Sequence, residues 1–99
     1  MFVVITYDVS SRRTEIFRKI LTRFLTHEQN SVFLGDLTES SWKKLHASLS
    51  KAMIPGDRIL KLEAKHKHSV SVSNLRKNPG NGSLEDISAL HHVKSSLIL

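Results

Sequence analysis

Several features that would place a chain of 99 residues in a special class are missing here. There is no cysteine, which excludes a disulfide framework and a thiolate metal site and fits a reducing compartment such as the cytoplasm. No apolar run approaches the length of a membrane span, and no basic segment leads into an apolar stretch as in a signal peptide. We therefore expect a cytoplasmic protein of one domain, small enough to gain stability from pairing.

Acidic residues are scarce relative to basic ones. Fifteen Lys and Arg residues against nine Asp and Glu residues give a net charge of +6 and a pI near 10.0. Eight basic and five acidic residues precede or include Gly56, and seven basic and four acidic residues follow it, so each part carries +3. Such a spread of positive charge is typical of domains that meet phosphates, although it can also serve solubility alone.

The N-terminal half is organised as strand, helix, strand, helix. Residues 2–7 are apolar, aromatic or β-branched, which predicts a buried strand. Apolar residues then recur with helical spacing over residues 16–25. Residues 31–37 predict a second strand, with Gly35 at a bulge or a point of close approach. A second helix follows, for which Thr38 is the expected N-cap.

The C-terminal half is predicted from shorter patterns. Residues 57–64 and 69–75 alternate apolar and polar side chains, which predicts two half-buried strands that could form a hairpin. Ser83 is the expected cap of a short helix over residues 84–93. The chain then ends in the apolar sequence SSLIL, which could add to a neighbouring sheet edge or fold back on its own core.

Together these elements predict an α+β fold. The order resembles a ferredoxin-like sandwich of the βαββαβ type, with two helices on one face of an antiparallel sheet. We expect the ferredoxin-like domain to span residues 1–77 and a C-terminal extension to span residues 78–99. The extension would consist of a loop, a short helix and the apolar end, and it could pair with a partner subunit.

Asp8 ends the first predicted strand. A lone buried carboxylate is costly, so Asp8 should have a cation, hydrogen bonds or solvent nearby. An Asp at this position is often only an Asx turn or a helix cap, and a functional carboxylate is the alternative.

Two sequence motifs at a fixed separation indicate a protein family. The first strand ends in the dipeptide YD and is followed by small hydroxyl residues and two arginines; the segment QNSVFLG follows at residues 29–35, and Trp42 stands near the start of the second helix. Over about residues 2–75 this pattern resembles the CRISPR-associated protein 2 family of small dimeric ferredoxin-like proteins of spacer acquisition. The chain departs from the family pattern at His27, where many members carry Arg, and in a slightly short turn after Asp8.

The resemblance implies a metal-dependent endonuclease site. In a two-fold homodimer the two copies of Asp8 would approach each other, and a divalent cation, Mg²⁺ or alternatively Mn²⁺, would relieve their repulsion. Asp8 would then be both the catalytic residue and the metal ligand for hydrolysis of single-stranded RNA or double-stranded DNA. Tyr7, Ser10 and Phe33 would support the site.

The resemblance also implies an adaptor role. The dimer would bridge the CRISPR adaptation integrase and lie against duplex DNA through phosphate contacts. Five basic residues are candidates for this surface, unless they are only solvated helix surface: Arg12, Arg13, Arg18, Lys19 and Arg23.

The sequence is also compatible with two other functional classes. One is a ferredoxin-like ribonuclease of the toxin type that cleaves messenger RNA. The other is a non-enzymatic regulatory ferredoxin-like domain, which usually carries a Gly-rich loop after the first strand; the sequence DVSSRR lacks one.

Overall fold

The computed structural model describes residues 1–87. The chain forms two compact units, Met1–Ser69 and Val70–Leu99, and the second is described as far as Ile87.

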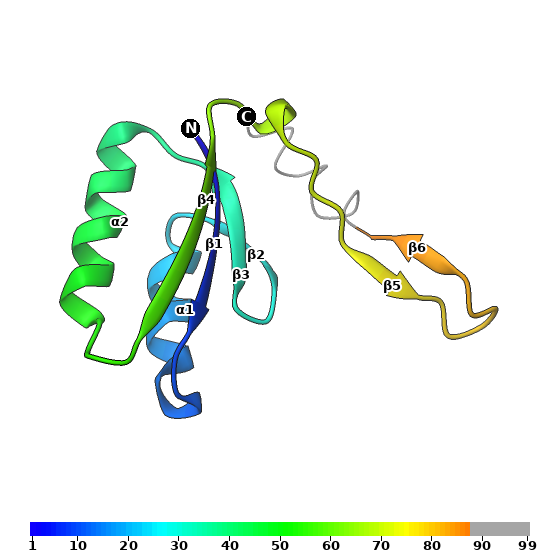
Figure 1. Ribbon diagram of the computed structural model, residues 1–99, viewed down its shortest axis with the longest axis horizontal. Helices are drawn as coiled ribbons and strands as arrows, with labels where there is room; N and C mark the ends of the chain where they lie inside the picture. The colour runs from blue at the N-terminus through cyan, green and yellow to red at the C-terminus, as the bar shows by residue number, and fades with distance from the viewer. Residues whose placement is uncertain (88–99) are drawn as a thin grey trace. The chain divides into compact units, whose positions relative to one another are not determined.

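The first unit contains a four-stranded antiparallel sheet and two helices (Figure 1). Its elements in chain order are β1 (Phe2–Asp8), a 3-10 turn (Ser11–Arg13), α1 (Thr14–Thr22), β2 (Thr26–Gln29), β3 (Val32–Asp36), α2 (Glu39–Ala52), β4 (Arg58–Ala64) and a second 3-10 turn (Lys67–Ser69). The strands lie in the order β2-β3-β1-β4. This βαββαβ arrangement confirms the predicted ferredoxin-like fold.

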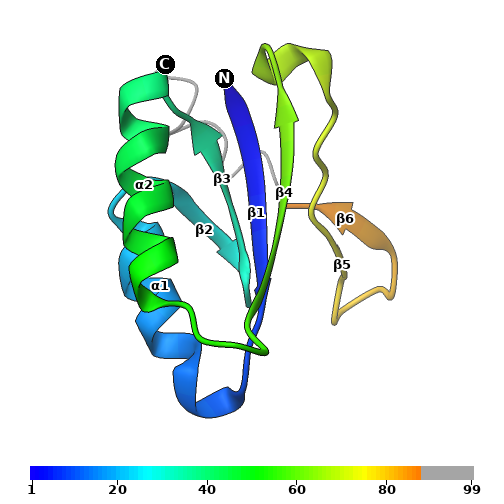
Figure 2. The same ribbon diagram turned by 60° about the vertical axis from the view of Figure 1, so that its left-hand side comes forward.

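Both helices lie on the same face of the sheet, as Figure 2 shows, and the core fills the space between the two layers. The central strand β1 contributes Val3, Ile5 and Tyr7 to this core, all buried. The core residues that the helices contribute are Phe17 and Leu21 from α1 and Leu45 and Leu49 from α2. Since side chains alternate along a strand, Val4, Thr6 and Asp8 belong to the opposite face.

Strand β2 was not expected from the sequence. Its four residues, THEQ, contain no apolar side chain, so no period of two marks them. They form a strand because a turn at Asn30, with φ of 40°, returns the chain against β3. The bulge in this pair lies between His27 and Gln29 rather than at Gly35.

Gly35 is a point of close approach, as predicted. A Cβ atom on Gly35 would lie 3.2 Å from Cδ2 of Leu25, and the backbone there has φ of 156°. The second helix also begins where it was expected, because the Thr38 side chain accepts a hydrogen bond of 3.0 Å from the Ser41 N–H. The longer helix, α2, has 14 residues, and no helix within residues 1–87 has the length and apolarity needed to cross a bilayer.

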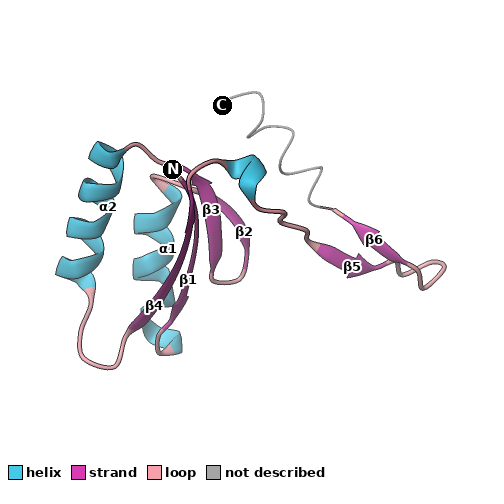
Figure 3. Cartoon of the chain, turned by 45° about the horizontal axis from the view of Figure 1, so that its top comes forward, coloured by secondary structure: helices cyan, strands magenta, loops and turns pink. Residues whose placement is uncertain are grey.

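The described part of the second unit contains a small hairpin, labelled β5 and β6 in Figure 3, and it differs from the sequence-based expectation. Strands β5 (Leu75–Lys77) and β6 (Leu84–Asp86) pair with each other. The prediction of a strand over residues 69–75 was therefore wrong, and so was that of a helix beginning at residue 84. Residues 57–64 contain β4 as predicted, but β4 pairs with β1, so the suggested hairpin with residues 69–75 is not formed. The remainder of that expected helix and the apolar end SSLIL lie outside the described residues.

The reason for this difference is the turn between β5 and β6. The Asn78 side chain accepts hydrogen bonds from the backbone N–H groups of Gly80 and Asn81, at 2.7 and 3.1 Å. Gly82 has φ of 71°, which suits glycine. This local turn chemistry favours a hairpin over the weak helical spacing of the apolar residues that follow.

Candidate functional site

Asp8 ends the central strand on the face of the sheet that the helices do not cover. Its side chain is exposed, and it has no hydrogen-bond partner among the residues that the structure describes. The 3-10 turn after it has Ser10 at its N-cap position, without a side-chain capping bond. Asp8 is therefore a solvated carboxylate and does not cap the following helix or close an Asx turn.

A basic residue that the sequence did not single out lies across from Asp8. In the antiparallel pairing of β1 with β4, Asp8 stands directly opposite Arg58. The two lie in one surface depression, whose lining residues are Thr6, Tyr7, Asp8, Arg58, Ile59 and Leu60. The alternation of apolar and polar residues over 57–64 predicts that Arg58 and Leu60 share one face of a strand. The register of β4 against β1 is what places Arg58 opposite Asp8.

Tyr7 and Phe33, two of the expected supporting residues, lie in the core on the other face of the sheet. The Tyr7 ring packs between Phe17 and Phe33, with ring centroids 5.7 and 6.1 Å apart. Phe33 is fully buried and also stacks on His27 at 4.4 Å. Burial raises the pKa of the Tyr7 hydroxyl, with a smaller opposing effect of Arg18. These rings hold the strands beneath Asp8.

Arg13, a candidate for nucleic-acid contact, is engaged within the fold. Its Nη2 atom lies 2.9 Å from Oδ2 of Asp57 and donates to the Ala52 carbonyl oxygen at 2.7 Å. Asp57 also accepts a hydrogen bond from the Ile54 N–H, and its side chain is only 5% exposed. This Arg13–Asp57 ion pair joins the turn after Asp8 to the turn before Arg58.

The other basic candidates lie along the surface of α1 and its ends. Arg18 is paired with Glu15, one turn earlier on the same helix. Arg23 lies over the Phe24 ring, with its Cζ atom 5.6 Å from the ring centroid. Arg12, Lys19 and Arg23 are exposed and form no ion pair with any described residue. Their charges are therefore the most accessible of the five.

A site for the divalent metal needs carboxylate or imidazole groups that lie close together. Within the described part of the chain, no group of three or more His, Asp or Glu side chains could hold a metal ion. Among the described residues, Asp8 is the only carboxylate that lines its depression. Because Mg²⁺ is commonly held by one or two carboxylates together with water and a substrate phosphate, Asp8 fits such a site if a second carboxylate joins it.

The face that carries Asp8 also exposes large apolar side chains. Leu60 and Leu62 of β4 are each 58% exposed, and they stand opposite Thr6 and Val4 of β1. Exposed leucines side by side on one strand are unusual for a monomer and typical of an interaction surface.

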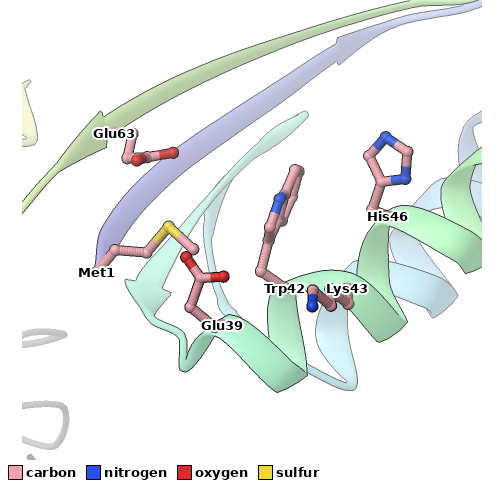
Figure 4. Close-up of a pocket in the computed structure, with 6 residues that line it drawn as sticks. All are labelled: Met1, Glu39, Trp42, Lys43, His46 and Glu63. Atoms are coloured by element: carbon pink, nitrogen blue, oxygen red, sulfur yellow. The ribbon is translucent and has the colours of Figure 1, made fainter.

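A second hollow lies between α2 and the β4 edge of the sheet, away from Asp8. Figure 4 shows Trp42 standing between Met1 and Glu39 on one side and His46 on the other. The Lys61 Nζ atom lies 3.9 Å from the centroid of the Trp42 ring, over one of its faces. The indole packs against the core, and Lys61 obstructs stacking of a nucleobase on that face.

Comparison with known proteins decides the family. The family described as "CRISPR associated protein Cas2" matches residues 1–70. This chain belongs to the Cas2 family. A protein of Haloferax volcanii named "CRISPR-associated endoribonuclease Cas2" is 38% identical over 69 residues, which cover 70% of this chain and 80% of that protein. A protein of the same name from Thermococcus kodakarensis is 34% identical over 91 residues, covering 88% of this chain and 99% of the relative.

Solved Cas2 structures have the same fold. Streptococcus pyogenes Cas2 superimposes with a TM-score of 0.61 at 25% identity, covering 73% of this chain and 98% of that one. A second crystal structure, titled "Crystal structure of cas2", gives a TM-score of 0.59 at 26% identity and covers 73% and 95% of the two chains. The matched family region ends close to the boundary of the first unit.

The Arg13–Asp57 ion pair predicts a specific pH dependence of stability. The hydrogen bonds from Arg13 and the Ile54 N–H lower the pKa of the Asp57 carboxyl. The stability that Asp57 contributes is therefore present above its unfolded pKa, about 3.9, and is lost as the pH falls through its lower folded pKa. Asp57→Asn should lower the midpoint of thermal unfolding at pH 7 by about 5 °C or more.

Thermal unfolding monitored by circular dichroism between pH 2.5 and 7 measures this effect. The difference between Asp57→Asn and the unsubstituted chain should shrink toward zero at the acid end. Glu63→Gln is the matched control, because Glu63 forms an exposed pair with Lys61 and should change the midpoint little. A difference that stays constant at all pH values would contradict an ionised Asp57 as its cause.

Proposed function

We propose that this chain is a homodimeric, divalent-metal-dependent endoribonuclease in which Asp8 is the catalytic carboxylate. The observation that carries the proposal is the position of Asp8, exposed and unpartnered among the described residues at the end of the central strand, in a chain of the Cas2 family. The names of the relatives from Haloferax volcanii and Thermococcus kodakarensis favour RNA as the substrate.

Asp8 suits this role because its side chain forms no ion pair or hydrogen bond with any described residue. Its carboxylate would hold Mg²⁺, or alternatively Mn²⁺, together with Asp8 of a second copy. When bound, the metal supplies electrostatic stabilisation of charge at the scissile phosphate. The chain itself contributes the rigid end of β1, the packed rings of Tyr7 and Phe33 beneath it, and the Ser10 turn that leaves Asp8 open to the substrate.

The exposed leucines support the dimer. Leu60, Leu62 and Asp8 share one face of the sheet, so a second copy packed on this face by a two-fold axis would cover the leucines and bring both Asp8 side chains to the same interface. A two-fold interface uses the same surface on both copies, and one acid per copy is then sufficient for a two-carboxylate site.

The nuclease proposal is tested by Asp8→Asn. Wild-type protein should cleave a single-stranded RNA oligonucleotide only with Mg²⁺ or Mn²⁺, and Asp8→Asn should lower kcat/KM by at least about 100-fold because the carboxylate ligand is lost. The variant should keep its thermal midpoint and its dimeric state, since Asp8 has no partner in the described fold. Cleavage at the wild-type rate in Asp8→Asn would reject Asp8 as the catalytic residue.

The dimer proposal is tested by charged substitutions at the exposed leucines. Leu60→Lys combined with Leu62→Lys should weaken self-association by at least about 100-fold, roughly 3 kcal/mol, because two apolar contacts are lost and two charges would be buried. Analytical ultracentrifugation measures the association, and cleavage should fall with it. Ile54→Lys is the control, since Ile54 is 50% exposed but lies in the turn before β4. Dimers of unchanged strength would place the interface elsewhere.

We further propose that the dimer binds duplex DNA and bridges the CRISPR adaptation integrase. The exposed cations Arg12, Lys19 and Arg23 support the DNA contact, and Lys19 and Arg23 are one helical turn apart. Arg13 and Arg18 add less to this surface, because Asp57 and Glu15 already pair with them.

Charge reversal tests the duplex contact. Lys19→Glu combined with Arg23→Glu should weaken binding of a DNA duplex by at least about tenfold and reduce the dependence of log K on log salt, since fewer counterions are released. Lys44→Glu combined with Lys51→Glu is the matched control, with the same change in net charge on exposed positions of α2. Equal losses in both variants would show that only net charge matters. Fluorescence anisotropy at several salt concentrations measures both effects.

A further inference from the structure

The Asp8 carboxylate and the Arg58 guanidinium belong to residues that stand directly opposite each other in the sheet, yet they form no ion pair. Asp8 and Arg58 are register partners on β1 and β4, so their Cβ atoms lie about 4.5–5.5 Å apart on one face. Opposite charges in such positions commonly form a cross-strand ion pair. Neither side chain forms an ion pair with any described residue.

The backbone on both sides of this pair is fixed. Arg13, in the turn that follows Asp8, binds Asp57, the residue immediately before Arg58. The Asp57 N–H donates to the Ile54 carbonyl oxygen at 3.0 Å, which closes the turn that leads into β4. The start of β4 is therefore anchored, while the Arg58 side chain itself remains exposed.

The surroundings of Arg58 suit a phosphodiester group. The depression that it shares with Asp8 is lined otherwise by Thr6, Tyr7, Ile59 and Leu60, so Arg58 supplies the only positive charge that residues 1–87 place there. A guanidinium offers two parallel N–H groups that match two oxygens of a phosphate, and it is always charged. The neighbouring carboxylate opposes this attraction only in part, and a cation bound to it would remove the opposition.

We infer that Arg58 is a phosphate-binding residue of the Asp8 site, which holds the phosphodiester of a nucleic-acid strand beside the catalytic carboxylate. This inference rests on the proposed nuclease function and adds a residue to it. Arg58 binds and orients the phosphate by donating hydrogen bonds; it transfers no proton and forms no covalent bond. In this arrangement the Asp8 carboxylate binds the cation, and the Arg58 guanidinium binds the phosphate of the substrate.

A purely electrostatic role for Arg58 has different consequences. If Arg58 served only as a counterion to Asp8, its removal would lower the Mg²⁺ concentration needed for half-maximal cleavage, and any loss of RNA affinity would come from the uncompensated Asp8 carboxylate and would disappear when Asp8→Asn is also present. If Arg58 binds phosphate, its removal weakens RNA binding even when no divalent metal is present.

The deciding experiment measures binding of a fluorescent single-stranded RNA in EDTA, where no cleavage occurs, and cleavage in Mg²⁺. Arg58→Ala should raise Kd in EDTA by about tenfold or more, reduce the slope of log K against log salt by about 0.7, and raise KM in Mg²⁺. Arg58→Lys should keep most of the salt slope but recover only part of the affinity, because the two-pronged contact is lost. Lys44→Ala, which removes an exposed cation from α2, should change Kd by less than twofold.

The outcomes separate this inference from the proposed function. An unchanged Kd in Arg58→Ala, or an equal loss in Lys44→Ala, overturns phosphate binding by Arg58. Circular dichroism checks that Arg58→Ala is folded; if it is not, the Arg58→Lys affinity decides, and a Kd equal to that of wild type overturns the two-pronged contact. A wild-type protein that does not cleave RNA in Mg²⁺ rejects the nuclease proposal, while binding in EDTA still decides the role of Arg58.

Discussion

Antiparallel pairing of β1 on both of its sides is the constraint on which the rest of this structure depends. Five register pairs join β1 to β3, and seven join it to β4. This pairing sends Val3, Ile5 and Tyr7 into the core and leaves Asp8 at the open end of the opposite face. It also determines which residue of β4 stands beside Asp8. A shift of one residue would exchange the two faces and remove both the core and the site.

The charges of this small domain fall into two groups with different tasks. Arg13 and Asp57 are largely enclosed and hold two turns together, and Arg18 and Glu15 pair along α1. Arg12, Lys19 and Arg23 remain exposed, as does Arg58 at the start of β4. The net charge alone does not distinguish these groups. Only their partners show which cations are available to a polyanion.

The exposed apolar face of the sheet and the single carboxylate of the site both favour association with a second copy. A sheet covered by helices on one face leaves apolar side chains on the other, and here Leu60 and Leu62 are more than half exposed. A single carboxylate is a weak ligand for a divalent cation, and Asp8 is the only acid that the described part of the chain places in its depression. Self-association through this face would satisfy both needs at once, which makes the proposed dimer part of the site as well as of the fold.

The sequence by itself determined the elements whose patterns are strong. The continuous apolar run of β1, the helical spacing of α1 and α2, the Thr38 cap and the close approach at Gly35 could all be predicted, because each depends on residues near in sequence. The YD and QNSVFLG motifs were sufficient to suggest the family. Strand β2 carries no apolar alternation, and the β5–β6 hairpin depends on side-chain bonds within its turn, so neither could be predicted from hydrophobic pattern.

Tertiary structure alone decided which distant residues meet. Arg13 and Asp57 are 44 positions apart in the chain, and no local pattern marks them as partners. Arg58 reaches Asp8 only through the register of β4 against β1, which long-range packing of the sheet against two helices selects. The sequence therefore identified Asp8, the acid at the candidate site. Folding decided that Arg58 lies beside it and that Arg13 instead holds two turns together, because both arrangements depend on contacts between segments far apart in the chain.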